Sequence, residues 1–361
     1  ALGARQAQPG EFTKRAFLAG RMDLSQAQAV AELVNAPTAA GAGLALARLE
    51  GVMARRVGEL RGRLEALRVQ ICLAVDFPED EVECLDAGPF RAAVAAVDAD
   101  MARLAAAHGR ARPFREGELA VLAGPVNAGK SSLLNALVGR ERAIVCDIPG
   151  TTRDVLEEQL DLDGLPLRLA DTAGLRDTDD PVEREGVARC VGLMERARLV
   201  LLVLDGSRPV DAAELEAQCG PMSLDSARVL GVVNKADLPP PGGDAADPRA
   251  FFGAAGLDHV EVSARTGQGL EELCRVMRQR LLGQDGPPAE SQPVPNDREL
   301  ALLTAARQEL ALLSAGLTAG DPPDLLGVRL ESACAHLADI TGEITSDAVL
   351  NAIFDGFCIG K

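Results

Sequence analysis

The eight residues from Gly124 to Ser131 read GPVNAGKS, and they constrain the fold more than any other stretch of the sequence. They match the pattern GxxxxGK[ST], in which glycines let the backbone wrap its N–H groups around a phosphate. An apolar run, 119–123, precedes this motif, and a helical pattern follows Gly129. A strand, a glycine-rich loop and a helix in this order predict a P-loop within an α/β sheet.

Residue chemistry predicts how the phosphate end of this site works. Lys130 is expected to reach the β- and γ-phosphates, and Ser131 to offer its hydroxyl to Mg²⁺. Asp171 begins the sequence DTAG, which places a carboxylate beside the metal and the N–H of Gly174 where a γ-phosphate would lie. Thr152, in the sequence TTRD, is expected to supply a second Mg²⁺ hydroxyl from a switch segment.

Two later motifs predict a guanine base. The sequence NKAD, 234–237, ends an apolar run, and the carboxylate of Asp237 can accept both the N1–H and the N2–H₂ of guanine. The sequence SAR, 263–265, follows the last apolar run, where a backbone N–H can meet the guanine O6. Five motifs in this order predict a GTPase. The expected nucleotide contacts in these motifs are Asn127, Ala128, Gly129, Lys130, Ser131, Ser132, Asp171, Thr172, Ala173, Gly174, Asn234, Lys235, Asp237, Ser263, Ala264 and Arg265.

The residues that would assist GTP hydrolysis are less directly indicated by the sequence. In Ras-like enzymes a glutamine after the DxxG motif orients the attacking water, and here that position is Leu175. Asn127 could hold a monovalent cation beside the phosphates and supply positive charge there. Glu183 could position the water, or it could be a solvated acid at a helix start, because other acidic residues surround it. Spacing alone favours the solvated acid, so the catalytic candidates from the motifs are Lys130 and Asn127.

Residues 116–285 alternate short apolar runs with helical patterns, which predicts an α/β domain. Helices are expected after Gly129, Val182, Asp211 and Gly269. The predicted strands are Leu119–Ala123, Val155–Leu162, Leu167–Asp171, Leu199–Asp205, Val229–Asn234 and Val260–Ser263.

Both ends of the chain carry helical periodicity instead. Apolar residues recur every three or four positions in 24–34, in one long stripe from Leu46 to Ile71, and in 90–104, which Arg112-Pro113 is expected to end. Two more stripes cover 303–317 and 326–340, and a last helix is expected to start near Ser346-Asp347. The economical fold is α/β plus all-α, with the α/β domain inserted into one helical domain built from both ends.

Composition limits the partners. The net charge is −17, but residues 1–115 hold 15 basic against 14 acidic side chains. Because phosphate contacts dominate nucleic-acid affinity, any nucleic acid should meet this near-neutral third or a partner protein. The eight cysteines show no CxxC spacing, so we expect neither a zinc site nor a disulfide framework. No apolar run reaches the roughly 18 residues of a membrane span, and we expect a cytoplasmic protein.

Beyond the GTPase motifs, four segments resemble one family closely. They are PGEFTKRAF (9–17), RMDL (21–24), DFP (76–78) and FCIGK (357–361), and together with the inserted GTPase motifs they resemble the MnmE (TrmE) tRNA modification GTPases. The resemblance covers essentially the whole chain. It implies a Ras-like P-loop G domain inserted into a helical-bundle domain, after an N-terminal folate-binding domain.

The resemblance also implies domain boundaries. Residues 1–22 correspond to the end of the folate-binding domain, 23–115 to the first part of the helical domain, 116–285 to the G domain and 286–361 to the second helical part. Most of the folate-binding domain has no counterpart here. That domain also makes the family's constitutive dimer, so stable dimerisation and one-carbon transfer by this chain are open, whereas pairing through G domains is expected.

Several site residues follow from the resemblance alone. Glu183 matches the acid that orients the catalytic water, whereas spacing alone favoured a solvated acid at a helix start. Arg21 and Lys361 match positions beside the folate, and Cys358 matches a cysteine implicated in modification, although a buried small apolar residue is its ordinary alternative. The implied potassium ligands are Asn127, Cys146, Ile148 and Thr151, and the loop Cys146, Asp147, Ile148, Pro149, Gly150, Thr151 and Thr152 is expected to contact the nucleotide.

The resemblance implies GTP, Mg²⁺ and K⁺ as cofactors, with a tetrahydrofolate derivative for members that carry the folate-binding domain. It implies an FAD-dependent partner of the MnmG (GidA) type, which together with this chain builds a carboxymethylaminomethyl group on C5 of the tRNA wobble uridine. tRNA is expected to bind mainly through that partner. Two other functions remain open: a GTPase switch for ribosome assembly, and a GTPase without modification activity.

Overall fold

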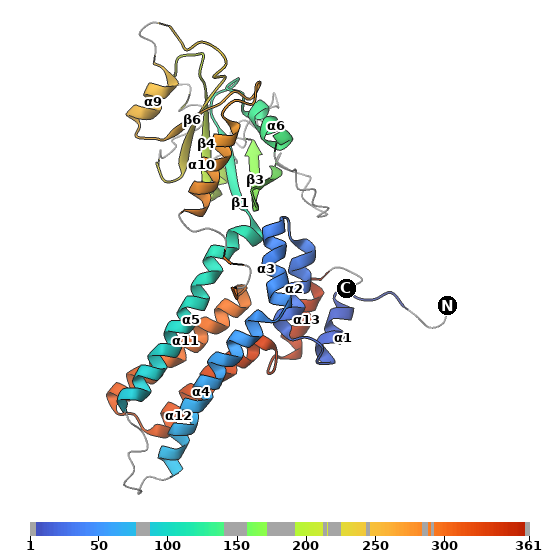
Figure 1. The fold of residues 1–361 in the computed structure, drawn as a ribbon, viewed down its shortest axis with the longest axis vertical. Coiled ribbons are helices and arrows are strands. Elements are labelled where there is room, and N and C mark those ends of the chain that lie inside the picture. The colour runs from blue at the N-terminus through green and yellow to red at the C-terminus, as the bar shows by residue number, and fades with distance from the viewer. Residues whose placement is uncertain are drawn as a thin grey trace. The chain divides into compact units, whose positions relative to one another are not determined.

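A computed structural model describes residues 5–76, 87–140, 157–171, 192–211, 215, 225–242, 246–283, 288–289 and 292–357. Its contacts divide the chain into two compact units. The helical unit combines Ala1–Arg112 with Pro287–Lys361, and the second unit is Pro113–Gly286. Figure 1 shows both units, each with its own layers of helices or strands. An α/β unit is therefore inserted into a helical unit that both ends of the chain build.

Four long helices form the centre of the helical unit: α4 (Val52–Asp76), α5 (Ala87–Glu116), α11 (Asp297–Ala319) and α12 (Pro323–Thr341). Every third or fourth residue of each helix is apolar and points into one shared core, as the predicted stripes require. The core residues include Leu60, Leu64, Ile71, Phe90, Val97, Met101, Leu303, Leu310, Leu330 and Leu337. The stripes of α11 and α12 therefore pack against those of α4 and α5, far apart in the sequence.

Among the described helices, α11 is long and apolar enough to cross a membrane by length and composition alone. Leu303, Leu310 and Leu313 on this helix are buried in the core of the helical unit. Packing within the unit therefore accounts for the apolar side of α11.

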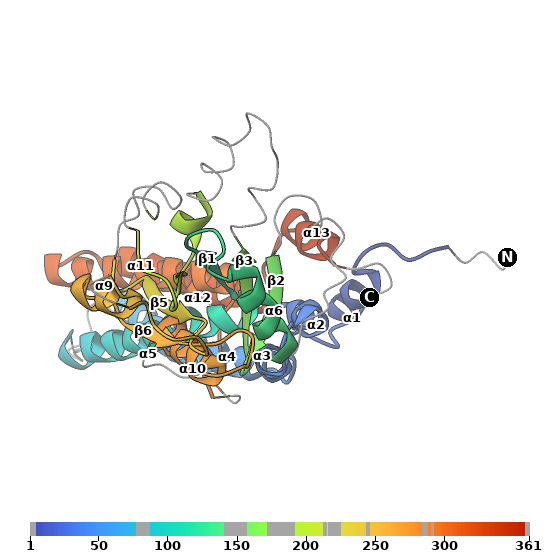
Figure 2. The same ribbon diagram turned by 90° about the horizontal axis from the view of Figure 1, so that it is seen from above.

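Four shorter helices complete this unit: α1 (Glu11–Leu18), α2 (Leu24–Asn35), α3 (Ala39–Leu49) and α13 (Asp347–Asp355). The last helix begins where predicted, after Ser346. Figure 2 shows α1 and α13 side by side, and Phe354 and Phe357 share a small core with Leu24. A Cβ on Gly10 would lie 2.7 Å from the carbonyl oxygen of Phe354, so the residue before α1 packs closely against α13.

Two predictions about helices were wrong. The stripe from Leu46 to Ile71 belongs to two helices, because the chain turns at Gly51, whose φ of +78° glycine tolerates best. Leu46 is consequently 47% exposed. Helix α5 also continues through Pro113 to Glu116. The missing N–H of a proline leaves the carbonyl four residues earlier without its helical partner, and that residue, Gly109, is exposed to water.

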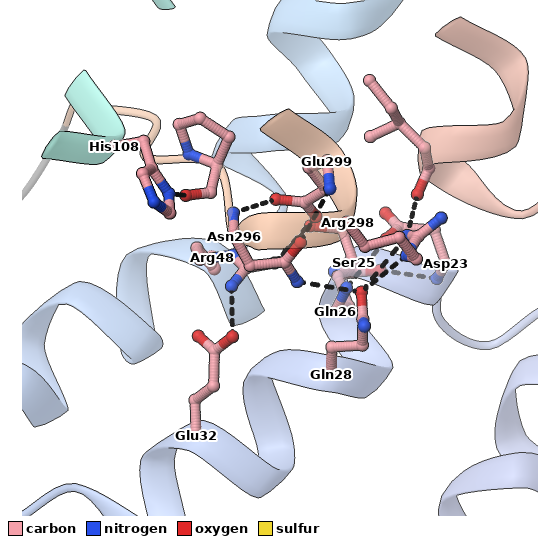
Figure 3. Close-up of polar contacts among 12 residues, drawn as sticks. Asp23, Ser25, Gln26, Gln28, Glu32, Arg48, His108, Asn296, Arg298 and Glu299 are labelled. Carbon is pink, nitrogen blue, oxygen red and sulfur yellow. Dashed lines mark hydrogen bonds and ion pairs between the residues drawn. The ribbon is translucent and has the colours of Figure 1, made fainter. Parts of the chain in front are cut away.

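A buried polar cluster fastens the start of α11 inside the helical unit (Figure 3). Arg48 on α3 is 2% exposed and donates to Glu299 at 2.7 Å, to Glu32 at 2.5 Å and to Ser25 at 3.3 Å. Asn296 caps α11 in a reciprocal pair of bonds with Glu299. The Nδ1 of His108 lies 2.9 Å from the carbonyl oxygen of residue 295. Side chains of α2, α3 and α5 thus hold the segment by which the chain re-enters this unit.

The second unit is a six-stranded sheet in the order β2-β3-β1-β4-β5-β6. The strands are β1 (Glu118–Ala123), β2 (Glu157–Leu162), β3 (Leu165–Asp171), β4 (Leu199–Asp205), β5 (Val229–Asn234) and β6 (His259–Glu261). All neighbouring pairs are parallel except β2 with β3. A strand lies at each of the six predicted places, which establishes the α/β class. The last strand ends at Glu261 and not at Ser263, and the predicted start of the second strand, Val155 and Leu156, lies outside the described residues.

The described helices of the α/β unit are α6 (Lys130–Arg140), α9 (Pro248–Ala254) and α10 (Leu270–Leu282). The predicted helices after Gly129 and Gly269 are confirmed, whereas those after Val182 and Asp211 fall largely outside the described residues. Sequence analysis missed α9, although Asp247 caps it and Pro248 occupies its first position. Because β1, β3, β4 and β5 are parallel, the residues that follow them gather at one edge of the sheet.

Candidate functional site

The P-loop connects β1 to α6 at the carboxyl edge of the sheet, and two of its glycines are required by space. Gly124 has a φ of +139°, and a Cβ there would lie 2.1 Å from the carbonyl oxygen of Val203. Gly129 has a φ of +91°, and a Cβ there would lie 2.3 Å from Nδ2 of Asn234. Only glycine fits where the backbone runs this close to neighbouring strands, and a tight turn of this kind is what a phosphate cradle requires.

The two residues that follow Gly129 supply the charge and the hydroxyl expected of a P-loop. Lys130 is buried, and its ammonium donates to the carbonyl oxygens of Gly124 at 2.9 Å and Pro125 at 2.8 Å. The ammonium therefore lies over the loop itself. Ser131 donates from Oγ to Oδ2 of Asp171 at 2.6 Å. The predicted metal hydroxyl and the predicted metal carboxylate are thus brought together from α6 and β3.

This pair of groups fits a magnesium ion. A hydroxyl and a carboxylate are hard oxygen donors, and Mg²⁺ in nucleotide sites is held by one or two such groups plus phosphate oxygens and water. Asp171 is buried at the end of β3, where Leu122 of β1 is its neighbour in the sheet. Strand register therefore fixes the carboxylate beside the P-loop.

Asn234 joins the two halves of the site. Its side chain is buried and donates from Nδ2 to the carbonyl oxygen of Ala128 at 2.9 Å, with a longer contact of 3.4 Å to that of Gly129. Its Oδ1 accepts the backbone N–H of Ala264 at 3.1 Å. One amide therefore links the P-loop to the loop after β6, which is the predicted base-binding side.

Asp237 has the environment of an ionised acceptor. Ser263, which is fully buried, donates from Oγ to Oδ1 of Asp237 at 2.6 Å, and Arg265 pairs with Oδ2 at 2.7 Å. The hydrogen bond from Ser263, together with the charge of Arg265, outweighs desolvation and lowers the pKa of Asp237. A carboxylate held in this way can accept two parallel N–H donors, which is what the N1 and N2 edge of guanine offers.

A residue that sequence analysis missed lies between the base side and the P-loop. Asp205 ends β4, and its Oδ2 accepts the ammonium of Lys235 at 2.6 Å. Lys235 also donates to the carbonyl oxygen of Asn127 at 2.9 Å. Burial alone would raise the pKa of Asp205, but the bonds from Lys235 and Ser207 lower it on balance. An acidic residue at the end of an apolar run was the only signal, and no GTPase motif includes it.

Asn127 itself has a φ of +63°, in the left-handed region that few non-glycine residues adopt. Its side chain is exposed beside the phosphate cradle. Of the other P-loop residues, Ala128 is buried and Ser132 is exposed in the first turn of α6.

The remaining predicted site residues divide into two groups. Arg21 is exposed in the turn after α1, where its N–H bonds to the carbonyl oxygen of Ala16 at 3.0 Å. The others lie outside the described residues: Cys146, Asp147, Ile148, Pro149, Gly150, Thr151, Thr152, Thr172, Ala173, Gly174, Leu175, Glu183, Cys358 and Lys361.

Comparison with known proteins identifies close relatives over the whole chain. The family described as the MnmE helical domain matches residues 24–358. The tRNA modification GTPase MnmE of Nitratidesulfovibrio vulgaris (strain DP4) is 50% identical over 99% of this chain and 77% of its own length. The protein of the same name from Thermus thermophilus is 42% identical over 99% of this chain and 76% of its own length.

Two solved structures are similar to about half of this chain. The G domain of the FeoB iron transporter of T. maritima is 29% identical, covering 45% of this chain and 98% of its own length, with a TM-score of 0.33. Era from Aquifex aeolicus is 24% identical, covering 54% of this chain and 67% of its own length, with a TM-score of 0.35.

Proposed function

Because this chain belongs to the MnmE family, we propose that it is a GTPase that hydrolyses GTP as a step in the modification of tRNA. The observation that carries this proposal is the convergence of six predicted residues on one edge of the sheet. Ser131 meets Asp171 at the phosphate end, while Ser263 meets Asp237 and Ala264 meets Asn234 at the base end. The two ends are linked through one buried amide.

Each group in the site has a definite role with GTP. Backbone N–H groups between Gly124 and Ser131 bind the phosphates, and the Lys130 ammonium moves from its carbonyl partners to the phosphate oxygens. Ser131 and Asp171 would hold a magnesium ion, which would supply positive charge to the phosphates. Asp237 selects guanine over adenine, because adenine lacks the paired donors.

We propose further that potassium takes part in hydrolysis through Asn127. Leu175 cannot orient water, so the developing negative charge needs another partner. The exposed amide of Asn127 is a hard oxygen donor beside the phosphate cradle, and the bond from Lys235 fixes its backbone. We propose Cys146, Ile148 and Thr151 as further ligands, Thr152 as the second magnesium hydroxyl and Glu183 as the group that positions water.

The test is the GTPase rate in potassium and in sodium at several protein concentrations. Potassium should raise kcat by roughly 10²–10³, which is typical of one preorganised charge in the transition state. The Asn127→Ala variant should lose this response while still binding GTP. Asn135→Ala, an exposed asparagine on α6, is the matched control and should keep it. A rate that is indifferent to the cation would reject the role of potassium.

The wider role rests on family membership. We propose that this chain acts in the cytoplasm with an FAD-dependent partner of the MnmG type to build a carboxymethylaminomethyl group on C5 of the wobble uridine. tRNA would bind mainly through the partner, and GTP would pair two G domains. Residues 1–22, 23–115, 116–285 and 286–361 are the proposed domain divisions. Arg21, Lys361 and Cys358 are proposed to serve a folate-dependent step, and the packing of α1, which precedes Arg21, against α13, which precedes Cys358 and Lys361, supports this.

Reconstitution separates modification from hydrolysis. Protein, partner, tRNA and a tetrahydrofolate one-carbon donor are combined, and the modified nucleoside is measured. Deletion of Gly360-Lys361 should abolish modification and spare GTP hydrolysis. Normal modification by the deletion variant would reject the role of Lys361. GTP hydrolysis without modification by the unaltered chain would favour a GTPase that modifies nothing.

A further inference from the structure

We propose that Asp205 is a positioning residue, which holds Asn127 of the P-loop in place through Lys235. Asp205 lies outside every GTPase motif in this sequence, at the last position of β4. It acts through two hydrogen bonds that the Lys235 ammonium donates, one to the carboxylate of Asp205 and one to the carbonyl oxygen of Asn127.

The first link is a carboxylate that cannot rotate freely. The side chain of Asp205 is largely buried, and its two oxygens have different partners. Oδ1 accepts the N–H of Ser207 at 2.9 Å and its hydroxyl at 2.7 Å, whereas Oδ2 accepts the Lys235 ammonium at 2.6 Å. A carboxylate fixed on one side by Ser207 therefore presents its other oxygen to Lys235 in one direction.

The second link is the lysine. A lysine side chain has several rotatable bonds, and a free ammonium would sample many positions. The bond to Asp205 removes that freedom and places Nζ 2.9 Å from the carbonyl oxygen of Asn127. Both Lys235 and Asn127 have left-handed backbones, with φ of +62° and +63°. Asparagine adopts this region more readily than most residues, and the bond from Lys235 adds to what holds the Asn127 backbone there.

The charge of Asp205 matters as well as its geometry. Without a partner, the Lys235 ammonium would leave a full positive charge next to the residue proposed to hold potassium. Two like charges a few ångströms apart repel strongly near a protein surface. The negative charge of Asp205 offsets the positive charge of Lys235, so that a cation can bind at Asn127 without this repulsion. The cation part of this inference rests on the proposed function, whereas the positioning part does not.

The test compares Asp205→Asn with Ser207→Ala in the full chain. The first variant removes the charge that holds Lys235. The second removes one bond to the same carboxylate but leaves Lys235 in place. The first readout is amide hydrogen exchange of peptides covering 125–131 without potassium or nucleotide. The second is the potassium concentration that gives half-maximal GTPase activity.

Asp205→Asn should speed exchange at 126–129 by about threefold or more, because local opening becomes easier. It should also raise the half-activating potassium concentration by roughly fivefold, since an unneutralised lysine repels the cation. In Ser207→Ala the exchange rate and the half-activating potassium concentration should both stay within about twofold of those of the unaltered protein, because the Lys235 contact remains. In a Lys235→Met background, Asp205→Asn should have no further effect on exchange.

Unchanged exchange in Asp205→Asn, or an equal effect with and without Lys235, would overturn the proposal. If the unaltered protein shows no potassium response, the proposed cation role fails, and the exchange measurement still decides the role of Asp205. Asp205→Glu keeps the charge on a longer side chain and replaces Asp205→Asn if that variant does not fold. Asp205→Glu should keep most of the potassium response of the unaltered protein. If it loses as much of that response as Lys235→Met does, the proposal would also be overturned.

Discussion

Replacing Asn234 by alanine tests whether one amide holds the two halves of the nucleotide site together. The change removes two well-formed hydrogen bonds, to the carbonyl oxygen of Ala128 at 2.9 Å and from the N–H of Ala264 at 3.1 Å. Each is worth about 1 kcal/mol. Ala128 is buried, so its carbonyl stays unsatisfied at a further cost of about 1–2 kcal/mol, whereas the half-buried Ala264 can recruit water. The free energy of unfolding should fall by about 3–4 kcal/mol.

Part of this loss should appear in binding, because GTP needs the P-loop and the base loop in fixed positions. We expect GTP affinity to fall by roughly tenfold or more, measured by titration with a fluorescent guanine nucleotide. Chemical unfolding of the same variant measures the stability. Asn135→Ala, on the exposed side of α6, is the matched control and should change neither. If Asn234→Ala binds GTP within twofold of the unaltered protein at undiminished stability, the linking role of this amide is wrong.

Three further variants or measurements follow from the described contacts. Glu299→Ala should lower the free energy of unfolding of the helical unit by about 3 kcal/mol, measured by circular dichroism of the helices in urea. This value is at the low end for a broken buried ion pair, because Arg48 keeps its bond to Glu32. An effect below 1 kcal/mol would contradict the buried-pair argument. Asp237→Asn should weaken GTP binding by roughly tenfold or more and improve binding of xanthosine triphosphate, with competition titration as the assay. Burial, chiefly, raises the pKa of the Cys334 thiol to about 11, so at pH 8 a maleimide should label the exposed Cys72 well before Cys334, as peptide mass spectrometry would record. Equal labelling in the folded protein would contradict the burial of Cys334.

The sequence predicted the nucleotide site well where a ligand dictates the residue type. A phosphate cradle needs glycines, and a metal needs oxygen donors, so the P-loop and Asp171 could be identified from the sequence. In the structure, Ser131 of the P-loop is hydrogen-bonded to Asp171. Contacts that the protein makes with itself are not fixed in this way. Asp205 meets Lys235 because β4 and β5 are neighbours in register, and the sequence carries no motif for that neighbourhood.

The helical unit shows a similar division. Periodicity predicted which residues are buried, because a stripe of apolar side chains on a helix is stable only when it packs against other apolar side chains. It could not predict where one helix ends and the next begins. Leu46 continues the spacing of Met53 by coincidence, and only the left-handed turn at Gly51 separates their helices. At Pro113 the packing of α5 outweighs the local preference of proline to end a helix.

The division of the helical unit between both ends of the chain has a consequence for synthesis. Helices α4 and α5 leave the ribosome about 180 residues before α11 and α12, with which they share a core. At about 5–20 residues per second, the wait lasts on the order of 10–40 seconds. During that time the apolar stripes of α4 and α5 have only each other, while the inserted α/β unit can complete its own core and fold. Chaperones that bind nascent apolar helices should therefore engage this chain before α11 emerges, and release it once α12 has been made.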